Sequence, residues 1–268
     1  MLRFKYVFVV LVYKNTQVLL DFFKSFNMPD SKVIIVNSFY DDNSLEECKA
    51  IAEKYKSDFI AIPNKGYGYG NNVGCKYAIE HYLFDYIIVS NSDIEIKNLK
   101  ALDSFDEEVA VYAPYVRIPS SKRQNPNIIS CFWVYYLLLK QGYKTGKRWM
   151  LTIARAICRL HREITLLFCG ILPIKKLKIF APHGCFIILT EKAVKKMSPI
   201  FNDEMFLYNE ELFLGFNCKK NGIPVYFVPE LSVYHLEGAS SSGNRNVGMS
   251  HNKQSFGILD KWRLSNGV

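Results

Sequence analysis

The carboxylate most clearly placed for chemistry is Asp93, which ends the sequence Ser90-Asn91-Ser92-Asp93 after the apolar run 86–89. A buried strand that ends in this way puts its carboxylate at the carboxyl edge of a sheet, where open α/β sheets bind ligands. A carboxylate there can hold a divalent cation, which can in turn hold a diphosphate. Asn, Ser and Asp are also ordinary turn formers, so a plain polar turn stays open at this point.

Three further residues in the last third of the chain carry similar potential. Glu210 and Glu211 begin a predicted helix over 209–220, where acids also interact favourably with the helix dipole and so have a structural explanation. His235 follows the short apolar strand 231–234 and precedes a Gly- and Ser-rich loop. A lone histidine is usually structural, but a place at the mouth of such a loop favours a functional role.

Strands alternating with helices must position these side chains over the first 95 residues. Such alternation predicts a parallel sheet with right-handed crossovers, and Ser44 with Glu47 forms a capping-box pattern. The predicted strands are 6–12, 33–36, 59–62 and 86–89, and the predicted helices are 16–26, 45–55 and 71–82. We expect Asn15, Asn37 and Asp93, which end three of the strands, to share one edge of the sheet.

The segment 64–74 carries glycines at alternate positions, Gly66, Gly68 and Gly70. This spacing predicts an irregular loop up to a helix that begins near Asn71. A loop of this kind can present backbone N–H groups to an anion or a sugar, although its spacing is not that of a P-loop. A plain connecting loop remains equally open.

The second half predicts further strands and helices. Pro114 is expected to close a strand over 109–113. The other predicted strands are 185–189, 225–228 and 231–234, the last two separated by Pro229, and the predicted helices are 147–167, 191–197, 209–220 and 254–264.

With 268 residues, of which 49% are hydrophobic, the chain can form one large α/β domain or one domain with an insertion. Its seven cysteines are scattered, odd in number and without a Cys-x-x-Cys pair, which favours a reducing compartment over a disulfide framework. The apolar run 6–12 is too short to span a bilayer and is interpreted as the first strand.

The net charge of +9 is concentrated in one segment. Residues 116–178 hold thirteen Lys and Arg and one acid, Glu163, whereas the rest of the chain has 21 basic and 24 acidic residues. The predicted helix 147–167 has an apolar face and a basic face formed by Arg155, Arg159 and Arg162. That pattern suits an anionic membrane surface, and a helical subdomain with a solvated basic face is the alternative.

Several motifs in order resemble the family 2 glycosyltransferases of the A-type fold, particularly the bacterial rhamnosyltransferase-like branch. The resemblance covers about residues 6–113 and 180–242. It rests on Tyr13-x-Asn15, an Asp-rich turn at 41–42, the glycine pattern of 64–74, Ser90-Asn91-Ser92-Asp93, His183-Gly184, Phe206-x-Tyr208-x-Glu210-Glu211 and His235-x-x-Gly238-x-Ser240.

The resemblance implies a role for each matching position. Asp93 and His235 would hold Mg²⁺ or Mn²⁺, and Glu211, beside Glu210, would be the catalytic base. The positions expected to bind the nucleotide sugar are Asn15, Asn37, Asp42, Asn64, Gly66, Asn71 and Asn91. Asn37 and Asn91 stand where the family often has acids, and Glu211 stands where it usually has Asp.

The expected fold class is therefore α/β, a mostly parallel Rossmann-like sheet flanked by helices, with a basic helical insertion. Residues 1–114 would bind the nucleotide-diphosphate sugar, 115–179 would form the insertion, and 180–268 would complete the catalytic and acceptor half with a C-terminal tail. The implied activity is inverting sugar transfer to a saccharide or polyprenyl-diphosphate-linked acceptor in bacterial surface polysaccharide synthesis.

The implied location is cytoplasmic, on the inner face of the cell membrane, through contact of 117–178 with anionic lipid and without a nucleic-acid partner. Two other functions remain open. A sugar nucleotidyltransferase would need a glycine-rich loop after the first strand, which Tyr13-Lys14-Asn15 lacks. A non-catalytic protein that binds through its basic surface is the other alternative; nucleic-acid binding of that kind would weaken steeply with salt.

Overall fold

One mixed sheet runs through the protein. The computed structural model describes residues 1–120, 123–171, 174–236 and 245–268. Within them the strand order is β3-β2-β1-β4-β8-β6-β9-β5, and β7 pairs with β9. The strands are β1 (Leu2–Val12), β2 (Ser31–Ser38), β3 (Asp58–Ile62), β4 (Tyr82–Asn91), β5 (Ile94–Asn98), β6 (Val111–Arg117), β7 (Leu177–Ile179), β8 (Phe186–Thr190) and β9 (Val225–His235).

The first four strands are parallel, which confirms the alternation seen in the sequence. In the pairing register, Val12 lies opposite Asn37 and Leu11 lies opposite Asn91. The carboxyl ends of β1, β2 and β4 therefore meet at one edge of the sheet, as expected for an open α/β fold.

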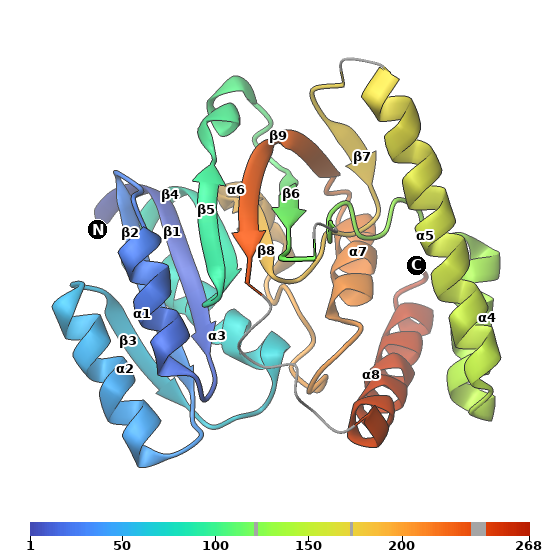
Figure 1. Ribbon diagram of the computed structural model, residues 1–268, viewed down its shortest axis with the longest axis horizontal. Coiled ribbons are helices and arrows are strands. Elements are labelled where there is room, and N and C mark those ends of the chain that lie inside the picture. The colour runs from blue at the N-terminus through green and yellow to red at the C-terminus, as the bar shows by residue number, and fades with distance from the viewer. Residues whose placement is uncertain (121–122, 172–173, 237–244) are drawn as a thin grey trace.

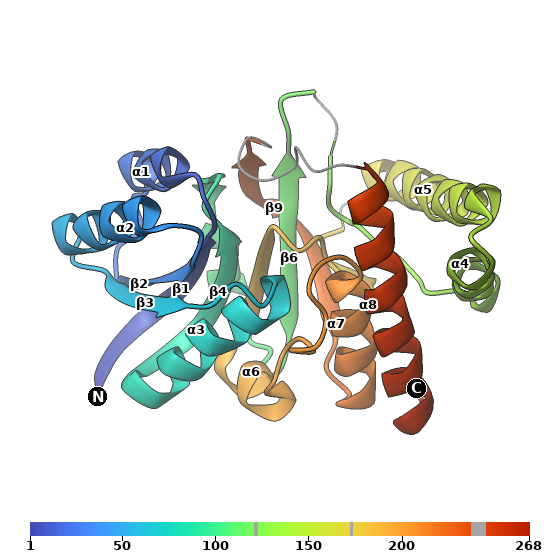
Figure 2. The same cartoon turned by 90° about the horizontal axis from the view of Figure 1, so that it is seen from below.

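Helices cover both faces of the sheet, and Figure 2 shows α1 and α2 on one side with α3, α6 and α7 on the other. The helices are α1 (Thr16–Ser25), α2 (Asp42–Lys54), α3 (Tyr67–His81), α4 (Trp133–Thr145), α5 (Arg148–Ile171), α6 (Glu191–Met197), α7 (Glu210–Lys220) and α8 (Arg245–Ser265), with a 3-10 turn η1 (Lys100–Ser104). Helix α2 begins earlier than predicted because Asp41, rather than Ser44, is its N-cap, and the Asp41 carboxylate accepts from Ser44 N at 2.8 Å.

The prediction of a loop up to Asn71 is wrong, since α3 begins at Tyr67 and includes Gly68 and Gly70. A Cβ atom at Gly70 would lie 2.4 Å from a methyl carbon of Leu11, and one at Gly74 would lie 2.3 Å from a methyl carbon of Val9. The glycines therefore allow the helix to pack closely on β1, which a propensity argument does not capture.

Two predicted strand breaks at prolines are also wrong. Strand β6 continues past Pro114 to Arg117, and β9 runs without interruption through Pro229. The β6–β9 register shifts between Pro114 and Tyr115, where the opposite strand moves from Val228 to Ser232. Pro229 therefore falls in an irregularity of the ladder, where a missing N–H donor costs little.

The basic segment forms an antiparallel helix pair, α4 and α5, at one side of the molecule (Figure 1). It packs with α7 and α8 around a separate apolar cluster that includes Tyr136, Leu151, Phe216 and Phe256. No helix within the described residues combines the length and apolarity needed to cross a bilayer.

Candidate active site

A cleft of about 670 Å³ opens at the carboxyl edge of the sheet. Tyr13, Ser38 and Asn64 line it just after β1, within the end of β2 and after β3. Its middle is lined by the polar turn after β4, the His183-Gly184-Cys185 segment and the start of α7. Side chains of α5 and Asn252 of α8 line it as well, and the volume is in the range of small-molecule sites.

Asp93 and His235 lie against each other beside this cleft. Strand pairing places Ile94 opposite His235, and Leu236 N donates to Asp93 O at 3.0 Å. The Nε2 atom of His235 is 3.1 Å from Oδ1 of Asp93, and the two side chains are 9% and 5% exposed. The turn after β4 and the end of β9 thus bring together the two residues for which the resemblance implied a metal.

Two residues that precede the helix pair hold histidines of the site in place. The Oε1 atom of Gln124 lies 2.7 Å from Nδ1 of His235. The buried amide of Asn125 accepts a hydrogen bond from His183 N at 2.7 Å. Residues 124–125 therefore position groups of the site, although the sequence placed them in an insertion.

Glu210 and Glu211 occupy the first turn of α7, and both line the cleft. Glu210 is buried, and its Oε1 atom has no hydrogen-bond partner among the described residues. Burial, and then the charge of Glu211, raise the pKa of the Glu210 carboxyl to about 8. Glu211 is half-buried and its Oε1 atom accepts a hydrogen bond from Gly184 N at 3.3 Å.

Gly66, Tyr67, Gly184 and Phe206 all line the cleft and contact one another, and we call this part of it the cleft floor. Tyr67 N donates to Phe206 O at 3.0 Å, and the Tyr67 hydroxyl donates to Gly184 O. Burial, and then the charges of the two glutamates, raise the pKa of the Tyr67 phenol well above its usual value. Tyr67 therefore keeps its proton and acts as a hydrogen-bond donor here.

Four of the residues predicted to bind the donor lie outside the lining of the cleft as the described residues define it. Asn15 caps α1 by accepting from Val18 N at 3.4 Å, and Asn37 is buried with its amide 3.4 Å from Cys48 Sγ. Asp42 is exposed in the first turn of α2. Asn71 is buried within α3, where its amide donates to Tyr67 O at 3.0 Å. Asn64, Gly66 and Asn91 do line the cleft.

Three arginines of α5 also line the cleft, which sequence reasoning missed. Arg155, Arg159 and Arg162 were assigned to a basic face available to lipid, whereas the structure turns them toward the site. Their spacing in the sequence indicates one helix face but not the surface to which that face turns. His183 was noted within a motif without being given a role, and it too lines the cleft.

The residues around Asp93 suit a divalent cation that is completed by a substrate. Asp93 and His235 provide one carboxylate and one imidazole, and the described part of the chain holds no group of three His, Cys, Asp or Glu side chains arranged for a metal. Mg²⁺ and Mn²⁺ accept such partial sets, since phosphate oxygens and water supply the remaining ligands.

No protein-family model matches the sequence, and no curated protein sequence matches it. Solved structures do share its fold. GalNAc-T7, solved with UDP, GalNAc and Mn²⁺, is similar with a TM-score of 0.61 and 12% identity over 90% of this chain and 46% of that one. TarS of S. aureus is similar with a TM-score of 0.54 and 14% identity over 87% of this chain and 36% of that one.

The mannosyltransferase PcManGT from Pyrobaculum calidifontis, solved with GDP-Man and Mn²⁺, gives a TM-score of 0.55 and 12% identity over 97% of this chain and 65% of that one. The chain spans less than two thirds of the length of each of these three proteins. Likeness at such identities establishes fold rather than activity. The chain therefore has the A-type glycosyltransferase fold, as its sequence predicted.

Proposed function

We propose that this protein is an inverting glycosyltransferase that uses a nucleotide-diphosphate sugar. The single observation that carries the proposal is that Asp93, which contacts His235, lines the same cleft of an A-type glycosyltransferase fold as Glu210 and Glu211. The similar structures were solved with UDP and GalNAc or with GDP-Man, which supports a nucleotide-sugar donor. We further propose that the protein belongs to the rhamnosyltransferase-like branch and acts in surface polysaccharide synthesis.

The proposed donor lies along the carboxyl edge of β1 to β4, where Tyr13, Ser38 and Asn64 line the cleft. The three parts predicted from the sequence, 1–114, 115–179 and 180–268, keep their proposed roles. Asp93 and His235 would hold Mg²⁺ or Mn²⁺, which would neutralise charge on the diphosphate leaving group. Mn²⁺ in the structures of GalNAc-T7 and PcManGT supports this metal assignment.

We assign proton removal from the acceptor hydroxyl to Glu211. A general base must be ionised near neutral pH and must reach the proton it takes. Glu211 lines the cleft and is fixed by Gly184 N, whereas the raised pKa of Glu210 keeps that neighbour largely protonated at pH 7. Attack from the side of Glu211, opposite the leaving diphosphate, would invert the anomeric configuration in one displacement.

A donor screen tests the proposal. Nucleotide sugars with uridine, guanosine and thymidine bases would be incubated with the protein, with Mn²⁺, with Mg²⁺ or with EDTA, and release of the nucleoside diphosphate measured. We expect turnover of one base class and its loss with EDTA. No release from any donor, by a protein whose folding is verified by circular dichroism, would contradict the proposal.

The outer surface of the α4–α5 pair supports contact with a membrane. Exposed apolar side chains run along α5, and Phe132 packs at 4.7 Å on His161, which joins the start of α4 to the same surface. We call this surface the apolar strip; its members are Phe132, Trp133, Trp149, Ile153, Leu160, Ile164, Leu167 and Phe168. Lys144, Lys147 and Arg148 adjoin its Trp149 end, which suits anionic lipid headgroups.

Vesicle sedimentation tests this membrane contact. Replacing both Leu160 and Leu167, which are 63% and 67% exposed, with serine should weaken binding to vesicles of anionic lipid at least about tenfold because apolar area is lost. Leu264→Ser is the matched control, since Leu264 is 61% exposed but lies on α8. Equal loss for both variants, or no binding by the wild type, would contradict the assignment.

A further inference from the structure

The three arginines that α5 turns into the cleft have no part in the donor chemistry described above. Arg155, Arg159 and Arg162 recur at helical spacing and line the same cleft as Glu210 and Glu211. The apolar strip occupies a different face of the same helix, since its exposed members Leu160 and Leu167 do not line the cleft. One helix therefore offers guanidinium groups to the cleft and apolar side chains to the outside.

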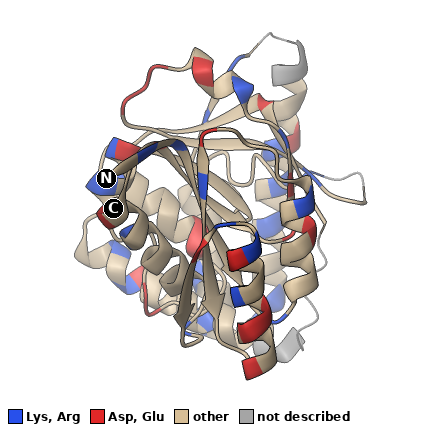
Figure 3. Ribbon diagram, turned by 90° about the vertical axis from the view of Figure 1, so that its left-hand side faces the viewer, with Lys and Arg blue, Asp and Glu red and all other residues tan. Residues whose placement is uncertain are grey.

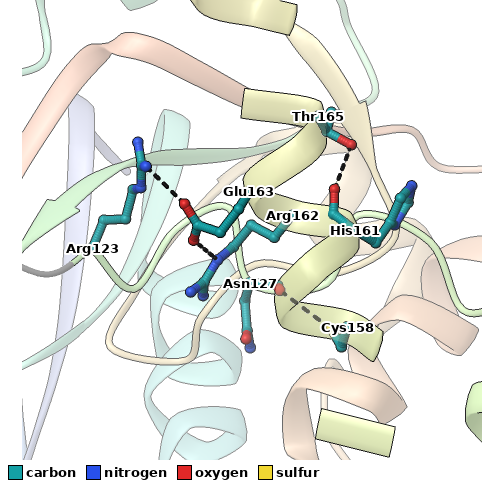
Figure 4. Close-up of polar contacts among 7 residues, drawn as sticks. All are labelled: Arg123, Asn127, Cys158, His161, Arg162, Glu163 and Thr165. Atoms are coloured by element: carbon teal, nitrogen blue, oxygen red, sulfur yellow. Dashed lines mark hydrogen bonds and ion pairs between the residues drawn. The ribbon is translucent and has the colours of Figure 1, made fainter. Parts of the chain in front are cut away.

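The charges of these arginines are only partly neutralised within the protein. Figure 4 shows that the Glu163 carboxylate forms ion pairs with both Arg162 and Arg123. Its Oε1 atom lies 3.1 Å from Nε of Arg162, and its Oε2 atom lies 2.9 Å from Nη2 of Arg123. Among the described residues, neither Arg155 nor Arg159 pairs with a carboxylate, although Arg155 interacts with the Tyr143 hydroxyl. Elsewhere the charges are mixed, and Figure 3 shows acidic and basic residues interspersed on the side that carries α1 and α2.

The arginines enter the cleft from the side opposite the proposed nucleotide. Tyr13, Ser38 and Asn64 line it from the β1–β3 side, and Figure 1 places α5 at the other side of the molecule, with α7 between them. Helix α7, which carries Glu210 and Glu211, therefore lies between the donor end and the arginine end. A molecule held at the arginine end would approach the donor from the side of the base, as an acceptor must.

We propose that Arg155, Arg159 and Arg162 form an acceptor subsite for a phosphate or diphosphate group, so that the acceptor is a phosphoryl-linked saccharide. This inference rests on the proposed glycosyltransferase function and names the substrate class of that same site. Guanidinium groups bind phosphate oxygens through paired, charge-assisted hydrogen bonds. Three of them, one partly neutralised by Glu163, match the charge of a phosphate ester better than that of a single carboxylate.

Titration calorimetry with EDTA present tests the subsite, because without a divalent cation no metal bridges a probe to Asp93 and His235. The probes are inorganic pyrophosphate, geranyl diphosphate, geraniol and glucuronate. We expect both diphosphates to bind the wild type, and the Arg155→Ala/Arg159→Ala variant to bind each at least about tenfold more weakly. The Arg155→Lys/Arg159→Lys variant keeps the positive charges but loses the paired guanidinium hydrogen bonds. Its affinity for the diphosphates should lie between those of the wild type and the alanine variant.

The matched control is Lys219→Ala/Lys220→Ala, which removes two exposed charges from the last turn of α7 and should leave both affinities as in the wild type. Tighter binding of geranyl diphosphate than of pyrophosphate would identify a lipid-linked acceptor. Equal binding of the two diphosphates would identify a soluble sugar phosphate as the acceptor. Binding that is independent of the arginines, or glucuronate binding as tightly as pyrophosphate, would overturn the proposal.

Donor kinetics separate this inference from the function on which it rests. A rise in the donor KM of the Arg155→Ala/Arg159→Ala variant by the same factor as its loss of diphosphate affinity would place the arginines at the donor, and would overturn the acceptor subsite while leaving sugar transfer intact. The absence of donor turnover in the wild type, in contrast, would remove the glycosyltransferase assignment itself.

Discussion

The Nε2 atom of His235 lies 3.1 Å from Oδ1 of Asp93, and both side chains are almost fully removed from solvent. The antiparallel pairing of β5 with β9 creates this contact, because it sets Ile94 opposite His235. The contact joins a turn in the middle of the chain to the end of its last strand. It gives the proposed metal site a rigid, strand-based support.

Removing the charge of Asp93 should abolish most donor turnover. Asp93→Asn keeps the shape of the side chain but weakens cation binding, and we expect kcat/KM with Mn²⁺ to fall by about a hundredfold or more. Asp85→Asn is the control, since Asp85 lies on β4, the strand that leads to Asp93, but pairs with Arg3 at the surface. Full turnover by Asp93→Asn, with an unchanged dependence on metal, would contradict the assignment.

The two glutamates of α7 should respond differently to the same substitution. Glu211→Gln removes the proposed base, so kcat should fall by about two to four orders of magnitude. Glu210→Gln mimics the protonated form that burial already favours, so kcat at pH 7 should stay within about tenfold of the wild type. Steady-state kinetics compare the pair, and a larger loss for Glu210→Gln would transfer the role of base to Glu210.

Glu210 should also make the stability of the protein depend on pH. Its pKa is about 8 in the folded protein and 4.5 in the reference state. The folded state therefore binds the proton more tightly, so this contribution to stability is complete below pH 4.5 and is lost as the pH rises through 8. Each pKa unit corresponds to about 1.4 kcal/mol.

Denaturant unfolding between pH 5 and 9 measures this effect. We expect the free energy of unfolding of Glu210→Gln to rise relative to that of the wild type as pH increases. Parallel curves for the two proteins would show that Glu210 titrates normally in the folded state.

Gly66 should not tolerate a side chain. Its φ angle is +107°, and a Cβ atom would lie 2.1 Å from Phe206 O, so Gly66→Ala should lower the free energy of unfolding by at least about 2 kcal/mol. Gly257→Ala is the matched substitution in α8, where nothing lies within 4 Å of the added carbon, and it should raise stability by about 0.5–1 kcal/mol. Equal effects in thermal unfolding would contradict this difference.

Local sequence information predicted the elements whose formation depends on their own residues. The apolar runs of β1 and β4 identified buried strands, and helix Glu191–Met197 was predicted with its observed bounds. The A-type fold followed from the order of the motifs. The strands and this helix depend on periodicity and capping, which are encoded within a few residues, whereas the A-type fold was implied by the resemblance.

The features that sequence reasoning missed depend on residues far away in the chain. Helix α3 includes Gly70 and Gly74 because Leu11 and Val9 of β1 leave no room for a side chain at these two positions. The direction of Arg155, Arg159 and Arg162 is set by the packing of α5 on α4, which the helix alone does not specify. The burial of Asn71 within α3 likewise follows from where that helix begins.

Main-chain contacts hold the cleft floor together: Tyr67 N donates a hydrogen bond to Phe206 O, and Gly66 packs closely against the main chain of Phe206. A side chain at Gly66 would clash with Phe206, and the Tyr67 hydroxyl is bonded to Gly184 O, so substitutions can hardly reshape this part of the cleft. Any divergence in donor or acceptor choice among proteins with this architecture would have to arise from the side walls. Helix α5 lines the cleft but lies outside the sheet, so its cleft-facing residues are the ones that can change without disturbing the sheet.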